Sequence, residues 1–141
     1  MKKAGLSLFL LLLASYLGAQ TLILEISHIR NAKGSIQLMF YKSAGSYEED
    51  LPFQVNRFPK DSVLDGCLKL SFQLPVGEYG IILLDDENES EVAEYNILGL
   101  PKEGFGFAGY YHRGIRRPEY KDFRFQLENE TKKMQLKIRY I

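Results

Sequence analysis

The segment with the clearest chemical character is acidic: residues 85–94 hold six carboxylates and no basic side chain. Four side chains with hard oxygen ligands fall at positions one, three, five and nine of a calcium-binding loop: Asp86, Asn88, Ser90 and Glu94. Glu91 stands at position six, which requires glycine, and Ile97 stands at position twelve, which requires a bidentate acid. The EF-hand is therefore excluded, and we expect calcium to bind weakly or not at all. A looser calcium site and a solvated connection between strands both stay open.

A basic segment, residues 112–117, follows two neighbouring tyrosines. Arginines near aromatic side chains can bind single-stranded nucleic acid. The chain has 18 basic and 18 acidic residues, however, whereas nucleic-acid-binding domains are usually strongly basic. An anionic partner, such as a lipid surface or an acidic glycan, fits the local charge. The simpler prediction is that this segment pairs with the acidic residues 85–94 of the same molecule.

A glycine-aromatic segment, residues 99–107, separates the two charged ones. Neither a following helix nor a basic residue at the spacing of a phosphate-binding loop is visible. Two interpretations stay open: a structured loop with glycines at positive φ and buried phenylalanines, or an aromatic binding surface at the end of a sheet. The three segments supply the candidate binding surface: Asp85, Asp86, Asn88, Phe105, Phe107, Tyr110, Tyr111, His112, Arg113, Arg116 and Arg117.

Catalytic chemistry has little support in the sequence. His28 and His112 are the only histidines, and no Gly-x-Ser-x-Gly motif is present. Side chains of sequence neighbours at a strand end diverge, so the adjacent Asp85 and Asp86 do not indicate a glycosidase pair. The single cysteine, Cys67, excludes a disulfide framework within the chain and leaves a free thiol or a bridge between chains. We therefore predict a protein that is not an enzyme and has no cofactor, calcium being the alternative.

The composition predicts one packed domain behind a removable leader. The chain has 141 residues, 45% of them hydrophobic, with nine Tyr and nine Phe, which excludes intrinsic disorder for its bulk. Residues 1–19 begin with two lysines and continue with an apolar run over residues 4–17, the pattern of a signal peptide. This run is too short for a transmembrane helix. We expect cleavage after Ala19, a domain over residues 20–141, and export to the periplasm or the cell exterior.

Alternating apolar residues predict strands throughout the domain. The alternation is clear at 22–26, 36–40 and 68–74, and residues 79–84 form a continuous apolar run that is typical of a central strand. Two more strands are expected at 123–127 and 134–140, and the first two are expected to form a hairpin. Residues 42–65 are predicted to be a long connection with one helical turn or an edge strand. Many short strands with Gly and Pro between them favour an all-β fold, a β-sandwich.

Three motifs resemble those of the domain-of-unknown-function family 2141, small exported bacterial proteins. They are Leu74-Pro75-Val76-Gly77-Glu78-Tyr79, Asp86-Glu87-Asn88, and Leu98-Gly99-Leu100-Pro101-Lys102-Glu103-Gly104-Phe105-Gly106-Phe107. The resemblance implies a β-sandwich of immunoglobulin or prealbumin type and no activity. In the first motif we expect the Tyr79 hydroxyl to close a turn of the tyrosine-corner kind.

The chain departs from the family pattern at three places. Asp85 stands where the family usually has histidine, Glu89 and Glu91 replace glycines, and residues 108–111 replace a stretch rich in asparagine. We therefore do not expect this chain to share any family chemistry that uses this histidine.

Taken together, the residues predict a non-enzymatic binding or envelope-associated module with an unidentified partner, neither nucleic-acid-binding nor transmembrane. A calcium-dependent carbohydrate-type binder and, further off, a hydrolase are the alternatives. If the three segments converge around a cavity, a binding site is favoured. If their side chains fill the space between them and their charges pair, a scaffold is favoured.

Overall fold

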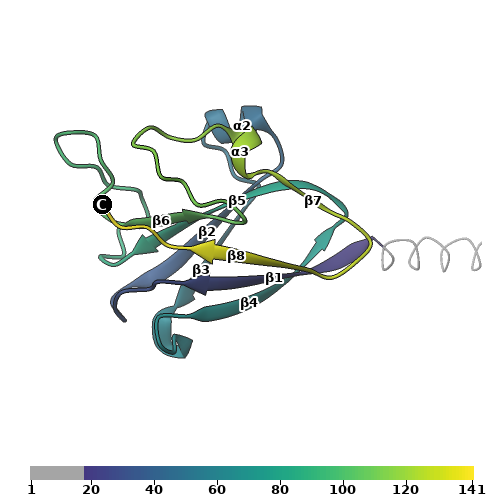
Figure 1. The fold of residues 1–141 in the computed structure, drawn as a ribbon, viewed down its shortest axis with the longest axis horizontal. Coiled ribbons are helices and arrows are strands. Elements are labelled where there is room, and N and C mark those ends of the chain that lie inside the picture. Colours follow the sequence, from purple (N-terminus) through teal and green to yellow (C-terminus); the bar gives the residue numbers. More distant parts are fainter. Residues whose placement is uncertain (1–17) are drawn as a thin grey trace, which may run out of the picture.

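The computed structural model describes residues 18–141, which form two β-sheets packed face to face (Figure 1). The smaller sheet has the order β4-β1-β8: β4 (Leu68–Pro75), β1 (Ala19–Ser27) and β8 (Lys132–Lys137). The larger sheet has the order β3-β2-β5-β6, with β7 also paired to β5: β3 (Gln54–Pro59), β2 (Ser35–Tyr41), β5 (Gly77–Asp86), β6 (Gly104–Phe107) and β7 (Phe125–Leu127). Three short helices connect strands: α2 (Ala44–Glu48), η1 (Lys60–Ser62) and α3 (Tyr120–Phe123). The predicted β-sandwich is confirmed.

The core lies between the two sheets and follows from the alternation in the sequence. Leu22, Leu24 and Ile26 of β1 are fully buried and face residues of β2 and β5 such as Leu38 and Leu83. Burial of one face of each strand is the main favourable contribution to folding. The predicted strands at 68–74 and 79–84 are confirmed as β4 and β5, and β5 is central in the larger sheet.

The predicted hairpin between the first two strands is wrong, because β1 and β2 belong to different sheets. Their connection, residues 28–34, is longer than a usual hairpin loop and places Ile29 in the core. The backbone N–H of Ile29 donates to the carbonyl of Gly66, 3.0 Å away, and His28 adopts a positive φ of 67°. The chain thus crosses from one sheet to the other, and β2 pairs with β3 and β5 instead. His28 lies exposed beyond the strand.

Two local predictions are confirmed. The connection at 42–65 contains both a short helix, α2, and an edge strand, β3. The hydroxyl of Tyr79 donates to the carbonyl oxygen of Pro75 at 2.6 Å and fixes the turn between β4 and β5. Residues 1–17 of the proposed leader lie outside the described part of the chain, whereas the proposed cleavage site, after Ala19, lies at the first residue of β1. Within residues 18–141, no helix has the length and apolar character needed to span a membrane.

The outer face of the larger sheet is also apolar, which the alternation alone does not predict. Buried aromatic side chains from α2, α3 and the sheet form a second cluster there: Tyr41, Tyr47, Phe107, Tyr120 and Phe123. Gly80 of β5 makes this possible, since a Cβ atom at this position would stand 2.6 Å from the Tyr120 ring and 2.8 Å from the Phe123 ring. Helices α2 and α3 lie together at one end of this face and leave the rest of it uncovered (Figure 1).

Candidate functional site

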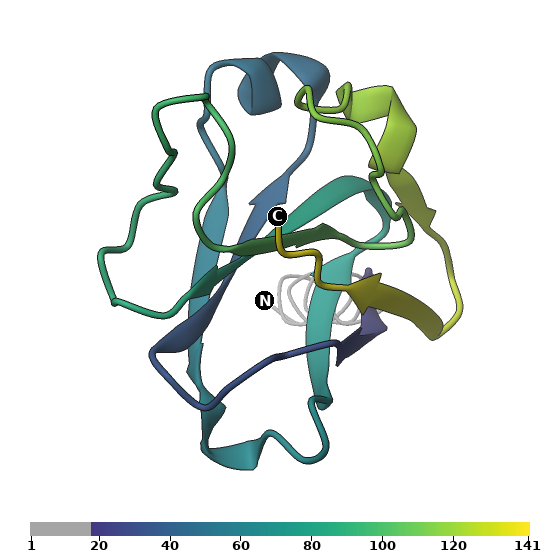
Figure 2. The ribbon, with the colours of Figure 1, turned by 60° about the vertical axis from the view of Figure 1, so that its left-hand side comes forward.

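A cleft of about 880 Å³ opens on the part of this outer face that the helices leave uncovered. Its floor is formed by side chains of the sheet, among them Met39, Ile82 and Phe105. Side chains from the two loops at the ends of β6, residues 87–103 and 108–119, contribute its walls. Figure 2 shows the course of these two loops. The cleft has the size and the mostly apolar lining of small-molecule binding sites.

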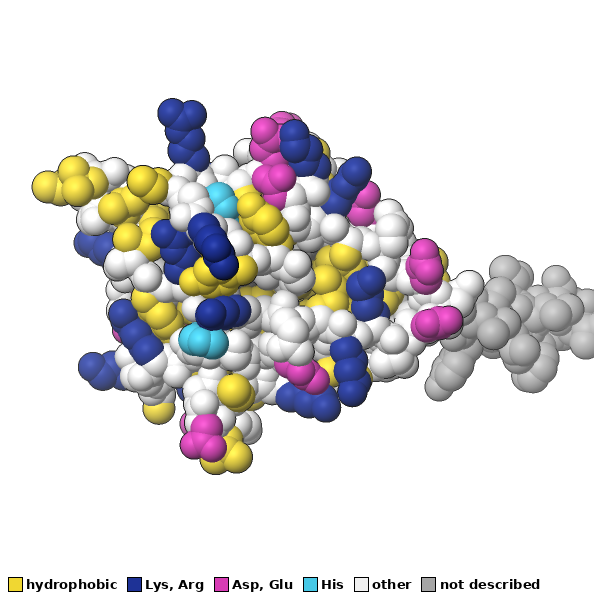
Figure 3. All heavy atoms as spheres, in the orientation of Figure 1, with side chains coloured by type: hydrophobic (Ala, Val, Ile, Leu, Met, Phe, Trp, Pro, Cys, Tyr) yellow, Lys and Arg dark blue, Asp and Glu magenta, His cyan; other side chains and the backbone are white. Residues whose placement is uncertain are grey.

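Hydrophobic side chains also stand exposed at the rim. Leu98 is 78% exposed and Ile115 is 75% exposed, and these two come from opposite walls of the cleft. Tyr95 and Val92 add to them on the first wall. Figure 3 shows hydrophobic side chains at the end of the molecule where the loop 87–103 lies, with Lys and Arg side chains close by. Adjacent exposed apolar side chains on a soluble domain typically mark a binding surface.

One ionisable side chain of the cleft wall, Glu103, has no partner among residues 18–141. It is only 6% exposed, and neither of its carboxylate oxygens accepts a hydrogen bond. Burial, followed by the charges of Asp86 and Glu94, raises the pKa of Glu103 to about 7. Buried carboxylates are normally paired, so an unpaired one with a perturbed pKa in a cleft is a functional-site candidate.

The acidic segment is built around Asp86, which is fully buried. Its carboxylate accepts hydrogen bonds from the backbone N–H groups of Ser90 at 3.0 Å and Glu91 at 2.8 Å. The Asn88 amide donates to Glu94 at 3.0 Å. Glu89 and Glu91, which replace family glycines, have positive φ values of 56° and 65°. The segment is therefore an ordered turn, and its backbone keeps the conformation that glycine favours.

The predicted pairing between the acidic and basic segments is wrong. Among residues 18–141, no ion pair joins them. Carboxylates of the acidic segment pair with cations of other elements: Glu87 with Arg30, Glu91 with Arg57, and Asp85 with Lys60. In the basic segment, Arg117 lies 3.9 Å above the Tyr47 ring and donates to the Tyr47 carbonyl at 2.9 Å. The two segments contribute to opposite walls of one cleft instead.

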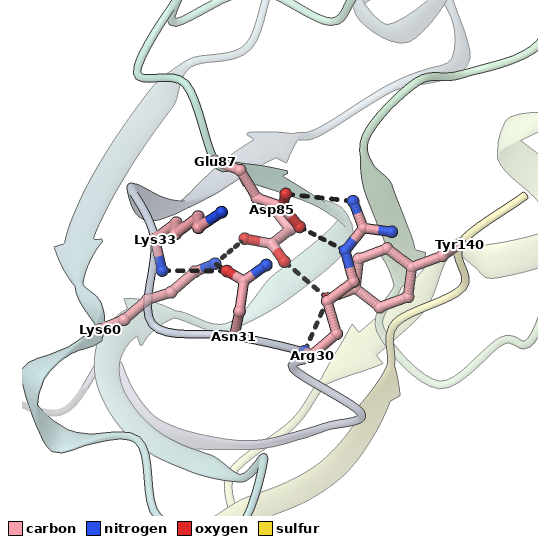
Figure 4. A network of polar contacts seen from close by, with 7 residues as sticks. All are labelled: Arg30, Asn31, Lys33, Lys60, Asp85, Glu87 and Tyr140. Carbon is pink, nitrogen blue, oxygen red and sulfur yellow. Dashed lines mark hydrogen bonds and ion pairs between the residues drawn. The ribbon is translucent and has the colours of Figure 1, made fainter.

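Asp85 lies in a buried polar network and does not line the cleft (Figure 4). It contacts the Lys60 ammonium, and the Tyr140 hydroxyl donates to it at 2.6 Å. Arg30 donates its backbone N–H to Tyr140 at 3.1 Å and its guanidinium to Glu87 at 2.5 and 3.1 Å. These residues come from both sheets or follow their strands, so the network ties the two sheets together at one end of the sandwich.

The glycine-aromatic segment is a loop only over residues 99–103, because residues 104–107 form strand β6, which corrects the interpretation of the whole segment as a structured loop. Gly99 has a positive φ of 76°, but Gly104 and Gly106 lie in β6 and serve close packing. A Cβ atom on Gly106 would stand 2.6 Å from the Leu136 side chain of the other sheet. The side chains of Phe105 and Phe107 point to the opposite face and line the cleft.

Five residues of the candidate binding surface line the cleft: Phe105, Phe107, His112, Arg116 and Arg117. The other members lie elsewhere: Asp85 and Asp86 are buried, Asn88 and Arg113 are exposed, Tyr110 packs on Phe107, and Tyr111 lies below the Lys137 ammonium. Cys67 is an exposed free thiol that is not part of the cleft lining. Within the described residues, no three His, Cys, Asp or Glu side chains are gathered to hold a metal ion as they lie.

Glu103 is a site residue that was not predicted from the sequence. The residue lies inside the third family motif, but its type and spacing carry no sign of burial. The one local sign that Glu103 could be buried is its position directly before the short glycine-aromatic strand β6, which packs closely against the other sheet.

Residues 24–135 match the family model of DUF2141, which is described as an uncharacterized protein conserved in bacteria. The chain belongs to DUF2141. The matched range begins within β1 and ends within β8, so it includes most of the sandwich, most residues that line the cleft, and Glu103. No curated protein and no solved structure matches the chain. DUF2141 is uncharacterized, so a function for this member has to be argued from its own site.

Proposed function

We propose that this DUF2141 protein is a non-enzymatic binding module of the bacterial envelope that takes an apolar ligand in the cleft on its larger sheet. The observation that carries the proposal is the apolar cleft of about 880 Å³, around which parts of the acidic, glycine-aromatic and basic segments converge. Loops that converge on a rigid sheet are a frequent arrangement for binding.

The environment of the cleft favours binding over chemistry. The two ring nitrogens of His112 contact the Tyr110 hydroxyl and the Arg116 carbonyl. In a catalytic triad they would instead contact a nucleophile and a carboxylate, so this histidine does not form one as it lies. The arginines at the rim, Arg116 and Arg117, suit a ligand with an apolar body and an anionic end.

Export and fold type belong to the same proposal. The leader over residues 1–19 is proposed to direct the protein to the periplasm or the cell exterior, leaving a domain over residues 20–141. The family resemblance supports a sandwich of immunoglobulin or prealbumin type. The single Cys67 and the near-neutral charge are compatible with such a compartment.

The cleft can be tested with the uncharged fluorescent probe N-phenyl-1-naphthylamine. We expect saturable binding at one site, with a rise in probe fluorescence, because the cleft offers a mostly apolar surface of the size of a small molecule. The double variant Leu98→Glu/Ile115→Glu is expected to lose this binding by at least about tenfold, since a charge on each wall must be desolvated when the probe enters. Both side chains are exposed, so the fold should be unaffected.

A matched control is Leu64→Glu, because Leu64 is also 75% exposed but does not line the cleft. This variant should bind the probe like the parent protein. Absence of saturable binding in the parent, or equal binding by the double variant and the parent, would contradict the proposed function.

A further inference from the structure

We propose that the two loops that wall the cleft dock this protein on an anionic lipid surface. The tip turn, residues 96–100 of the first loop, inserts among the lipids, and cations of both loops contact the headgroups. Three of the side chains that carry this docking, Ile97, Lys102 and Arg113, do not line the cleft. The docking therefore stands whether or not the cleft takes an apolar ligand.

The tip turn holds the most exposed large hydrophobic side chain of residues 18–141. Ile97 is fully exposed, at 102%, and its neighbours Leu98 and Tyr95 are exposed as well. Such a group of apolar side chains marks an interaction surface, because its removal from water is favourable. Since these side chains protrude at the end of a loop, a fluid apolar phase can surround them, whereas a protein partner would have to offer a matching pocket.

The backbone of the tip turn is suited to a place with little water. The Asn96 N–H donates to the Leu100 carbonyl at 2.8 Å, and the Gly99 N–H donates to the Asn96 carbonyl at 2.9 Å. The Asn96 side chain accepts the N–H groups of Leu98 at 2.9 Å and Leu100 at 3.0 Å. Backbone groups that leave water without another partner cost free energy. Because these groups bond within the turn, its insertion among lipids avoids much of that cost.

The second loop presents an apolar side chain of the same kind. Ile115 stands exposed between two arginines. The Arg139 guanidinium donates to the carbonyls of His112 at 2.9 Å and Gly114 at 2.7 Å, which holds this loop in position. Both loops reach toward the upper left of the molecule in Figure 1, so one surface can contact the two of them.

The charge of both loops is complementary to an anionic surface. Neither residues 95–102 nor residues 108–118 contain Asp or Glu, and together they contain one lysine and three arginines. Lys102, Arg113 and Arg116 are exposed, and none of them forms an ion pair within the described part of the chain. Figure 3 shows Lys and Arg side chains near the hydrophobic ones at this end of the molecule. Exposed apolar side chains beside cations are the combination that binds anionic membranes.

The acids that precede the tip turn are engaged with other side chains. Glu91 pairs with Arg57 at 3.7 Å, and Glu94 accepts a hydrogen bond from the Asn88 amide at 3.0 Å. Their repulsion from an anionic surface is therefore reduced, while the cations of both loops are free to contact it.

Tryptophan fluorescence tests the insertion, because the chain contains no tryptophan. Ile97→Trp places a single reporter on the tip turn. On vesicles of an equimolar mixture of phosphatidylcholine and phosphatidylglycerol, we expect its emission to shift to shorter wavelength and to saturate with lipid. Vesicles of phosphatidylcholine alone should bind at least about tenfold more weakly, because they lack the negative surface potential. Leu64→Trp is the matched control, since Leu64 is also exposed but lies between η1 and β4, and its emission should stay unchanged.

Two further variants separate the apolar and the charged contributions, with affinity measured by sedimentation with the anionic vesicles. Ile97→Glu should weaken binding by at least about tenfold, because a carboxylate replaces the apolar side chain and is repelled by the lipid. Lys102→Gln/Arg113→Gln should also weaken it by at least about tenfold and reduce its dependence on salt. Lys69→Gln/Lys133→Gln removes two exposed lysines from the smaller sheet and should bind within about threefold of the parent.

Absence of binding of the parent protein to the anionic vesicles would overturn the docking. Equal affinity of Ile97→Glu and the parent, or unchanged emission of vesicle-bound Ile97→Trp, would overturn the insertion of the tip turn. A dimer of the lipid-free parent that Ile97→Glu dissociates would overturn it in favour of a second copy of this chain. In lipid-free buffer, Ile97→Glu should bind N-phenyl-1-naphthylamine like the parent, because Ile97 does not line the cleft, so failure of the docking and failure of the proposed function are distinguishable.

Discussion

Replacing Lys60 with methionine is expected to lower the free energy of unfolding by about 3–5 kcal/mol, because it leaves a buried carboxylate without its cation. Lys60 and Asp85 contact each other, and both side chains are almost completely buried. The Tyr140 hydroxyl would remain as a single donor to Asp85, which does not replace a full positive charge. Denaturant titration of parent and variant measures the loss.

A second variant separates the loss of the pair from the loss of packing. In Lys60→Met/Asp85→Leu both charges are absent, and most of the stability should return, since buried ion pairs are often replaceable by apolar groups. Lys69→Met is the control, because this lysine is exposed on β4 and should leave the unfolding midpoint unchanged. If Lys60→Met is as stable as the control, the network in Figure 4 does not hold the sheets together.

Glu103→Gln should have the opposite effect and increase the free energy of unfolding above neutral pH. The folded-state pKa of Glu103 is about 7, above the ordinary 4.5. Between these two values the folded chain holds a proton that the unfolded chain has released, so stability falls as the pH rises through this window. One pKa unit corresponds to about 1.4 kcal/mol. As the pH rises from about 5 to about 8, the free energy of unfolding of the variant should therefore rise by about 3 kcal/mol relative to that of the parent.

The measurement is a series of denaturant titrations from about pH 5 to pH 8. Glu94→Gln serves as a comparison, since it removes a neighbouring charge and should lower the pKa of Glu103 without abolishing its titration. Parallel pH profiles of the parent and Glu103→Gln would show that this carboxyl is already ionised and solvated in the folded protein.

The sandwich was predictable because period-two alternation is a direct consequence of one buried face per strand. Strands β4 and β5 illustrate this, and the Tyr79 turn could be predicted from Pro75 and Gly77 before it. The partner of β1 was not predictable. A strand with one apolar face can pair within a hairpin or cross to the opposite sheet, and the choice depended on Ile29 reaching the core.

The segments of the site were predictable, but not their contacts. Charge patterns locate residues 85–94 and 112–117, yet they do not show which cations come from distant strands. Arg30, Arg57 and Lys60 reach the acidic segment only because the fold brings β1, β3 and their connections beside it. Burial of a single carboxylate such as Glu103 depends on tertiary packing, and the local sequence indicates it only through the short glycine-aromatic strand that follows.

The central claim, that the cleft on the larger sheet is the binding site, is tested most directly by NMR of ¹⁵N-labelled protein titrated with N-phenyl-1-naphthylamine. We predict that backbone shifts change along the cleft floor at Met39, Ile82 and Phe105 and in the walls near Leu98 and Ile115. Residues of β1 and β4 on the smaller sheet should stay unchanged. Shift changes confined to the smaller sheet, or no saturable shift change at all, would contradict the account.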